Sequence, residues 1–180
     1  MLLGGNVAVP KGRGVGGDFR HVPACRSSRR IGCVIAYSAF NQPPPPDALF
    51  GRLRGRPGDP SRLEILCTNP AALGGGSGPL RPYFMTKRFP GVLGMVADPP
   101  PAAPTPWVAF PGLYTARCQR EGGATWLQVD DLRPVGDQRP RVHQTLGPAW
   151  GLHLVDVNLA LGNLVDLAGA QAQAYARRRR

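Results

Sequence analysis

The chain has 180 residues, 42% of them hydrophobic, with 24 glycines and 21 prolines, and this composition predicts one domain with a buried core, many turns and few helices. The sequence contains no apolar run of about 18 residues and no charged leader followed by an apolar segment, so we expect neither a transmembrane helix nor a signal peptide in it. The formal net charge of +11 comes almost entirely from scattered arginines, a pattern typical of GC-rich genomes, and we do not expect a nucleic-acid partner.

The N-terminal segment MLLGGNVAV, residues 1–9, is apolar almost from its first residue. It predicts one buried strand, and it suggests that the chain begins partway through a larger sheet. The glycine-rich stretch that follows matches G-x-G-x-x-G at Gly12, Gly14 and Gly17. A dinucleotide site also needs a following helix and a carboxylate about twenty residues further on. Both are missing, so we expect a loop here and no cofactor.

Further strands are predicted along the middle of the chain. IGCVIAYSAF (31–40) is rich in β-branched and aromatic residues and predicts a buried strand, which the proline run NQPPPP ends. RLEILC (62–67) predicts a second short strand. Residues 81–106 show no regular pattern, and ADPPPAAPTP (97–106) is typical of an exposed linker. LYTARC and ATWLQVDD alternate around a glycine turn and predict an antiparallel hairpin.

The last segment predicts a helix that packs on a sheet, with Asp156 as its N-cap. The apolar positions assigned to the buried face are Val157, Leu161, Leu164, Val165, Ala168, Ala172 and Tyr175. We interpret residues 1–176 as part of a single domain and residues 177–180 as a basic tail.

Four cysteines form an even set without C-x-x-C spacing, so we expect no zinc or thioredoxin-type site. Cys25 and Cys33 flank a short polar segment, and Cys67 and Cys118 each end a strand-like run. Two disulfides with these pairings would indicate an oxidising compartment. Four free, buried cysteines are the alternative.

His153 lies between a glycine-containing loop and the last helix. In α/β-hydrolases the catalytic residues follow the order nucleophile, acid, histidine, with the histidine on a loop near the end. An imidazole in this place can take a proton from a serine hydroxyl and return it to the leaving group. A structural histidine at a helix entry is the alternative. A metal site at His153 and Asp156 would need further ligands, and no residue has the spacing for one.

Several long blocks resemble, in order, the C-terminal part of the bacterial domain-of-unknown-function family 3089. They are GGNVAVPKGRGVGGDF, PACRSSRRIGCVIAYSAFNQPPPPDALFG, LCTNPAALGGGSGPL, LYTARC and WGLHLVDVNLALGNL. The resemblance covers nearly the whole chain. It implies an α/β fold: the later strands and last helix of an α/β-hydrolase-like sheet, with long Pro/Gly-rich loops and a hairpin. It also implies a lysophospholipase- or esterase-like activity on an ester or lipid substrate, and an exported parent protein.

The same resemblance carries His153 over as the triad histidine, in the pattern H-x-x-D-x-N. His21 and His143 match no such pattern. The acid is open: Asp47, beyond the strand of residues 31–40, is the candidate, and Asp130 and Asp131 are alternatives.

The chain departs from the family at the nucleophile, because it contains no G-x-S-x-G. The nearest string, GGGSGP around Ser77, ends in Pro79 and lacks the strand and helix that hold such a serine. Ser38 lies within a predicted strand. We therefore predict the C-terminal part of a serine hydrolase, inactive by itself and without a cofactor or metal. The alternative from another class is an exported, non-enzymatic binding or structural module held by two disulfides.

Overall fold

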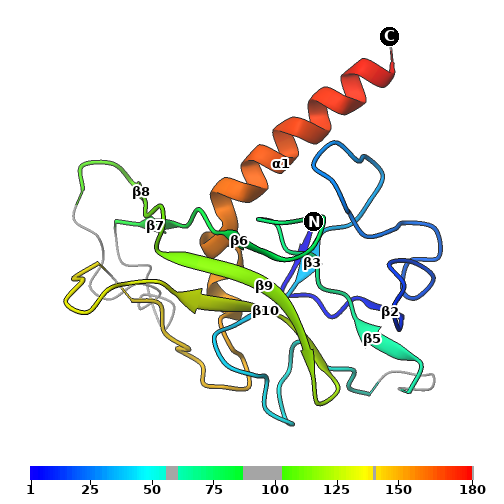
Figure 1. Cartoon of the computed structure of the whole chain (residues 1–180), viewed down its shortest axis with the longest axis horizontal. Coiled ribbons are helices and arrows are strands. Elements are labelled where there is room, and N and C mark those ends of the chain that lie inside the picture. The colour runs from blue at the N-terminus through cyan, green and yellow to red at the C-terminus, as the bar shows by residue number, and fades with distance from the viewer. Residues whose placement is uncertain (56–60, 87–102, 140, 180) are drawn as a thin grey trace.

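The computed structural model describes residues 1–55, 61–86, 103–139 and 141–179. Within these ranges the fold is mixed α/β with more sheet than helix, as the sequence predicts (Figure 1). The strands are β1 (Leu2–Leu3), β2 (Ala8–Pro10), β3 (Ala36–Tyr37), β4 (Ala39–Phe40), β5 (Leu63–Ile65), β6 (Ser77–Pro79), β7 (Tyr83–Met85), β8 (Trp107–Ala109), β9 (Tyr114–Glu121) and β10 (Ala124–Asp131). A short 3₁₀ helix, η2 (His153–Val155), leads into the helix α1 (Asp156–Arg178).

The largest sheet is built on the predicted hairpin, which is confirmed. β9 and β10 pair antiparallel over their full lengths, from Ala124 opposite Glu121 to Asp131 opposite Tyr114. Gly122 and Gly123 form the turn with φ of 51° and 75°, a backbone region that glycine enters without steric cost. β6 extends the sheet antiparallel to β9, and β4 extends it parallel to β10, which gives the order β4-β10-β9-β6.

The predicted strand of residues 31–40 is buried from Val34 to Phe40, but it is divided at Ser38. β3 pairs in parallel with β1, whereas β4 pairs in parallel with β10. The Leu127 N–H donates to the carbonyl of Ser38 at 2.9 Å, so the change of partner occurs at this residue. The segment therefore connects two ladders instead of forming one continuous strand.

The prediction of a single buried strand over residues 1–9 is wrong. The chain turns at Gly4, whose φ is 70°, and β1 and β2 on either side of the turn have different partners. β2 pairs antiparallel with β5, while β1 pairs only with β3 among the described residues. Met1 and Leu2 are 54% and 41% exposed, so β1 lies at an edge of its ladder.

The glycine-rich loop after β2 is followed by no helix, as expected. Gly17 is tightly packed, because a Cβ there would lie 2.0 Å from the carbonyl oxygen of Ala8. This glycine allows two stretches of backbone to approach each other. The close approach accounts for a glycine at position 17, with no need for a nucleotide-binding role.

Residues 81–106 are more regular than expected. β7 lies in this range and pairs antiparallel with β8, with Phe84 opposite Val108. Most of the predicted linker, residues 97–102, lies outside the described residues.

The C-terminal helix is confirmed, and Leu164 of the predicted face is buried, but most of the residues assigned to that face are exposed. Its buried residues include Leu159, Ala160, Gly162, Leu164 and Leu167. Val157, Val165 and Tyr175 are 46%, 60% and 49% exposed. The helix carries apolar residues on more than one side, so its sequence pattern alone does not show which side is buried. A Cβ at Gly162 would lie 2.7 Å from the Arg81 side chain.

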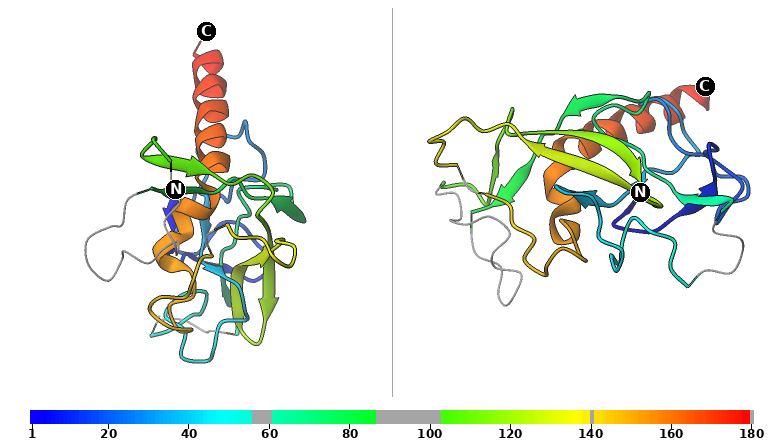
Figure 2. Two further views of the ribbon diagram at one scale, coloured as in Figure 1. Left: turned by 90° about the vertical axis from the view of Figure 1, so that its left-hand side faces the viewer. Right: turned by 60° about the horizontal axis from the view of Figure 1, so that its bottom comes forward.

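The two ends of α1 lie in different surroundings. Its first turns lie behind the sheet of β9 and β10, and its C-terminal half extends beyond the strands (Figures 1 and 2). The helix continues to Arg178, two residues into the predicted basic tail. Among the described residues, no helix combines the length and apolar character needed to cross a membrane.

Both predicted disulfides are present, Cys25–Cys33 and Cys67–Cys118. The first closes a loop with a sequence separation of 8 residues, and the second joins the end of the β5 segment to β9 across 51 residues. No free cysteine remains. In the chain-entropy account, a disulfide stabilises more when it closes a longer loop.

Removing the two disulfides separately should therefore have unequal effects. We expect Cys67→Ser/Cys118→Ser to lower the free energy of unfolding by about 4 kcal/mol, and Cys25→Ser/Cys33→Ser by about 2.5 kcal/mol. Urea unfolding of the two double variants beside the parent chain measures this. An equal or reversed order would contradict the loop-length account.

Candidate functional site

The loop that carries His153 is attached to β4 through backbone contacts. The Leu152 N–H donates to the carbonyl of Ala39 at 2.9 Å. Gly151 precedes it with φ of 56°, and a Cβ there would lie 2.4 Å from the Phe40 ring. Only glycine permits this approach, so the glycine brings η2, and His153 with it, against the edge of the large sheet.

His153 forms a hydrogen-bonded pair with Asp156, one helical turn further on. Its Nδ1 lies 3.1 Å from Oδ2 of Asp156, and the Asp156 carboxyl is only 2% exposed. The other carboxyl oxygen, Oδ1, accepts the Ala39 N–H at 2.7 Å. Both oxygens of the buried carboxyl therefore have partners, as a buried acid requires.

The interpretation of Asp156 as the N-cap of the last helix is wrong. Val155 occupies the N-cap position and makes no side-chain capping bond. Asp156 is the first residue of α1, and its carboxyl points to Ala39 and His153 instead of to the helix's own N–H groups. The side chain still accepts a backbone N–H, but from β4.

Tyr37 also forms a hydrogen bond with Asp156. Its hydroxyl donates to the backbone carbonyl of Asp156 at 2.8 Å, and its side chain is fully buried. Burial, and then the charge of Asp156, raise the pKa of the Tyr37 hydroxyl well above its ordinary value. Tyr37 thus remains a hydrogen-bond donor across the physiological pH range.

Burial raises the pKa of Asp156 to about 6, against the opposing hydrogen bonds from His153 and from the Ala39 N–H. Above that pH the carboxylate accepts the Nδ1–H of His153. This tautomer leaves the lone pair on Nε2, where it can take a proton. The imidazole is 28% exposed, so part of the ring is accessible to a reacting group. The pair therefore has the arrangement of a general base oriented by a carboxylate.

Gly4 covers the Nδ1 side of the imidazole. A Cβ at Gly4 would lie 2.0 Å from Nδ1 of His153 and 2.8 Å from Oδ2 of Asp156. The Gly4 N–H donates to the carbonyl of Tyr37 at 2.8 Å, which holds the turn in place. The N-terminal segment thus contributes to the site with its backbone.

Aromatic rings form the neighbouring wall. The Phe50 ring stacks on the His153 imidazole with centroids 3.9 Å apart and planes at 23°. The Trp150 ring lies 5.7 Å from Phe50 and 5.9 Å from His153. The Leu49 N–H donates to the Ala149 carbonyl at 2.9 Å, which connects the two loops that carry these rings. The site is therefore bordered by apolar surface.

The candidate acids predicted from the sequence contact other residues and not His153. Asp47 is exposed, and its backbone carbonyl accepts a hydrogen bond from Arg54 at 2.5 Å. Asp130 forms an ion pair with Arg117. The carboxyl that reaches His153 is that of Asp156.

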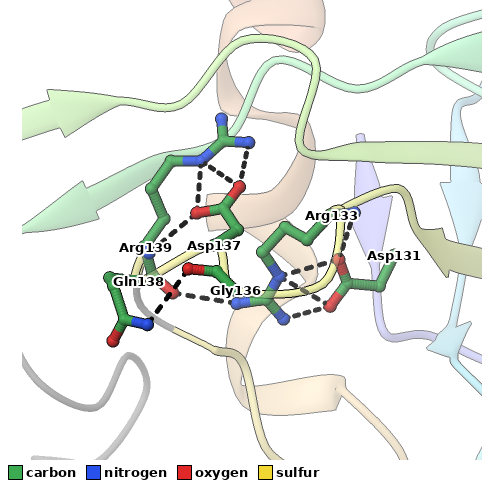
Figure 3. A network of polar contacts seen from close by, with 6 residues as sticks. All are labelled: Asp131, Arg133, Gly136, Asp137, Gln138 and Arg139. Carbon is green, nitrogen blue, oxygen red and sulfur yellow. Dashed lines mark hydrogen bonds and ion pairs between the residues drawn. The ribbon is translucent and has the colours of Figure 1, made fainter.

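Asp131 ends β10, and the loop that follows it is held by two arginine–aspartate pairs, shown in Figure 3. It pairs with Arg133, and this hydrogen bond, as the main cause, lowers the pKa of Asp131. Arg139 pairs with Asp137 at 2.5 Å, and its backbone carbonyl accepts a bond from Arg133 at 2.9 Å. These contacts order the loop between β10 and the final segment.

The two serines considered as nucleophiles are engaged in the fold. Ser77 is exposed on β6, and its hydroxyl lies 2.9 Å from that of Thr115. Ser38 is buried where the chain changes ladders, and its hydroxyl has no hydrogen-bond partner among the described residues. Neither is hydrogen-bonded to His153.

The remaining polar candidates contribute no metal site. His21 and His143 are exposed. The third member of the H-x-x-D-x-N pattern, Asn158, donates from its side chain to the carbonyl of Tyr83 at 3.1 Å and so joins α1 to β7. Within the described part of the chain, no group of three or more His, Cys, Asp or Glu residues could hold a metal ion.

Two residues of the site could not be assigned from the sequence. The sequence predicts a capping role for Asp156, because a carboxylate at a helix start usually caps. Its spacing of three residues from His153, across a helix start, was the available signal. Gly4 gave no signal beyond a glycine pair inside an apolar run.

Comparisons with protein-family models, curated proteins and solved structures find no match to this chain.

A methyl group at Gly4 should displace the imidazole. We expect Gly4→Ala to lower stability by more than the 1–2 kcal/mol or so that left-handed backbone costs an alanine, because its Cβ would overlap Nδ1 of His153. Gly12→Ala is the matched control, since Gly12 has φ of 72° and no heavy atom within 4 Å of its Cβ position. Thermal unfolding compares the two. Equal losses would show that Gly4 does not pack on the pair.

The raised pKa of Asp156 predicts a pH-dependent stability. Its folded-state pKa of about 6 lies above the ordinary 3.8, so the folded state binds the proton more tightly. The resulting stabilisation is complete below about pH 4 and is lost as the pH rises through about 6. Asp156→Asn should remove this dependence while keeping an acceptor for the Ala39 N–H. Urea unfolding from pH 3 to 8 tests this, and parallel pH profiles for the two proteins would contradict it.

Proposed function

We propose that this chain carries the histidine and acid of an α/β-hydrolase-like serine esterase of the domain-of-unknown-function family 3089. The observation that supports the proposal is the His153–Asp156 pair, a partly exposed imidazole held by a buried carboxyl that is itself bonded to the sheet. The histidine follows the strands and precedes the last helix, as it does in this fold, but Asp156 follows the histidine, whereas the acid of α/β-hydrolases precedes it.

In the proposed reaction, Nε2 of His153 takes the proton of a serine hydroxyl as the serine oxygen attacks the ester carbonyl. The tetrahedral intermediate collapses to an acyl-serine, and the imidazolium gives its proton to the departing alcohol. Water then attacks the acyl-serine by the same route and releases the acid. Asp156 keeps Nδ1 protonated and stabilises the imidazolium that forms between steps.

The aromatic wall supports an ester with an apolar acyl group as substrate. Phe50 and Trp150 are partly exposed beside the imidazole and present apolar surface to whatever approaches it. A lipid-type acyl ester matches such a border, since apolar surface favours contact with hydrocarbon over water. This agrees with the lysophospholipase-like activity that the resemblance implies.

In this proposal a segment outside this sequence supplies the nucleophile, since the sequence contains no G-x-S-x-G and neither Ser38 nor Ser77 is hydrogen-bonded to His153. A general base without a nucleophile and an oxyanion hole has nothing to activate. The proposal therefore requires that the reading frame upstream of Met1 encode a strand–turn–helix with such a serine.

The activity should depend on His153 and on that upstream serine together. We expect the 180-residue chain to show no labelling by a fluorophosphonate probe and no hydrolysis of p-nitrophenyl esters. The protein extended by the upstream segment should show both. There His153→Ala and Asp156→Asn should each reduce kcat by about 10⁴-fold. His143→Ala is the control, since it removes an exposed histidine, and it should leave the rate unchanged.

Three results would overturn this proposal. Labelling of the 180-residue chain that disappears in Ser77→Ala would make Ser77 the nucleophile. Hydrolysis that survives His153→Ala would indicate other chemistry. An upstream reading frame without a serine elbow would remove the proposed active site.

A second candidate is an exported binding or structural module without catalysis. Its support is the pair of disulfides, Cys25–Cys33 and Cys67–Cys118, which form and persist in oxidising compartments. In that case the 180-residue chain would fold cooperatively and stay monomeric, and the extended protein would not react with the fluorophosphonate probe.

A further inference from the structure

A basic surface lies at the far end of α1 from His153. Two arginines of the Cys25–Cys33 loop, Arg29 and Arg30, border a shallow hollow together with Arg177 and Arg178 of the helix. Ile31 and Ala174 also line it. Figure 1 shows this loop beside the C-terminal half of α1. We call these six residues the basic end.

Gln171 attaches the loop to the helix. Its side-chain N–H₂ donates to the carbonyl of Arg30 at 3.0 Å, and it lies 3.6 Å and 3.7 Å from the sulfurs of Cys25 and Cys33. The disulfide closes the loop and the glutamine holds it, so Arg29 and Arg30 lie around one hollow with Arg177 and Arg178 of the distant helix end.

The two segments that carry the basic end contain no acidic residue. Neither the loop from Cys25 to Cys33 nor the helix from Leu167 to Arg179 contains an aspartate or glutamate. The last acid of the helix, Asp166, is paired with Arg81 at 2.6 Å. The helix C-terminus supplies only about half a negative charge. Four arginines around one hollow therefore leave a strongly positive surface.

Apolar and aromatic side chains accompany these charges. Tyr175 is 49% exposed on the same helical turns, with the Arg179 guanidinium 5.0 Å from its ring centroid. Ile31 is partly exposed in the hollow. A membrane surface accommodates both kinds of group, because arginines meet the lipid phosphates while tyrosine and isoleucine enter the headgroup region. The backbone of a nucleic acid would use only the charges.

We propose that the basic end binds the surface of a membrane that contains anionic phospholipids. The C-terminal half of α1 extends beyond the strands, so the sheets do not obstruct its approach to a flat surface (Figures 1 and 2). The site of His153 lies at the other end of the helix, about 30 Å away at 1.5 Å per residue. The inference goes beyond the proposed esterase function and does not depend on it.

Vesicle sedimentation with the full chain tests the proposal. We expect binding to vesicles of phosphatidylcholine mixed with phosphatidylglycerol, and little binding to phosphatidylcholine alone. Arg29→Gln/Arg30→Gln and Arg177→Gln/Arg178→Gln should each weaken the partition by about thirtyfold, since each basic residue near an anionic surface contributes about 1 kcal/mol. Arg13→Gln/Arg20→Gln is the matched control, because it removes the same charge from two exposed arginines of another loop.

A second pair of variants tests the arrangement without changing the charge. Gln171→Ala releases the loop from the helix and should weaken vesicle binding severalfold. Gln173→Ala removes an exposed glutamine of the same helix and should have no effect. Circular dichroism and the thermal midpoint of every variant show that the fold is kept.

Equal losses for the Arg13/Arg20 variant and the basic-end variants would show that only net charge matters, and would overturn the proposal. So would vesicle binding that does not depend on phosphatidylglycerol. Tighter binding to an oligonucleotide than to the vesicles, lost with the same arginines, would assign the surface to nucleic acid instead.

Discussion

The site depends on the burial of one carboxyl group. Asp156 is 2% exposed, and a buried acid is stable only when its oxygens have partners. Those partners are the Ala39 N–H and the His153 ring, so the same interaction attaches the helix to the sheet and orients the imidazole. Burial also raises the pKa of Asp156 to about 6, which places its ionisation near the range where an imidazole works. The same contact therefore contributes to the stability of the fold and to the proton chemistry of His153.

The backbone groups that bind this carboxyl lie where the chain changes its strand partner. The chain leaves one parallel ladder at Tyr37 and joins another at Ala39. Both backbone groups of Ala39 bind the helix entry, its carbonyl accepting the Leu152 N–H and its N–H donating to Asp156. A continuous strand would have used these groups in a ladder. The division at Ser38 thus provides the attachment for the site, and Gly4 and Gly151 allow the close approaches around it.

Short strands and many loops characterise the rest of the molecule, and covalent and polar contacts hold the loops. Cys67–Cys118 joins the β5 segment to β9, and Cys25–Cys33 closes the loop that Gln171 attaches to α1. In a chain so rich in glycine and proline, such links lower the conformational entropy of the unfolded state. They also position side chains on the surface, as the four arginines at the end of α1 illustrate.

The sequence by itself determined the local elements: the hairpin of β9 and β10, the short strand β5 and the final helix; it also offered both cysteine pairs, with four free cysteines as the alternative. Their signals are alternation, helical spacing, glycine turns and cysteines that end strand-like runs, all of which lie within short stretches of chain. It also singled out His153. Only the tertiary structure decided which face of α1 is buried, where residues 1–9 and 31–40 break, and that Asp156 bonds to His153 and not to its own helix. These outcomes depend on contacts between residues that are distant in the sequence, from Leu2 with Ala36 to Ala39 with Asp156, and no local sequence pattern predicts such contacts.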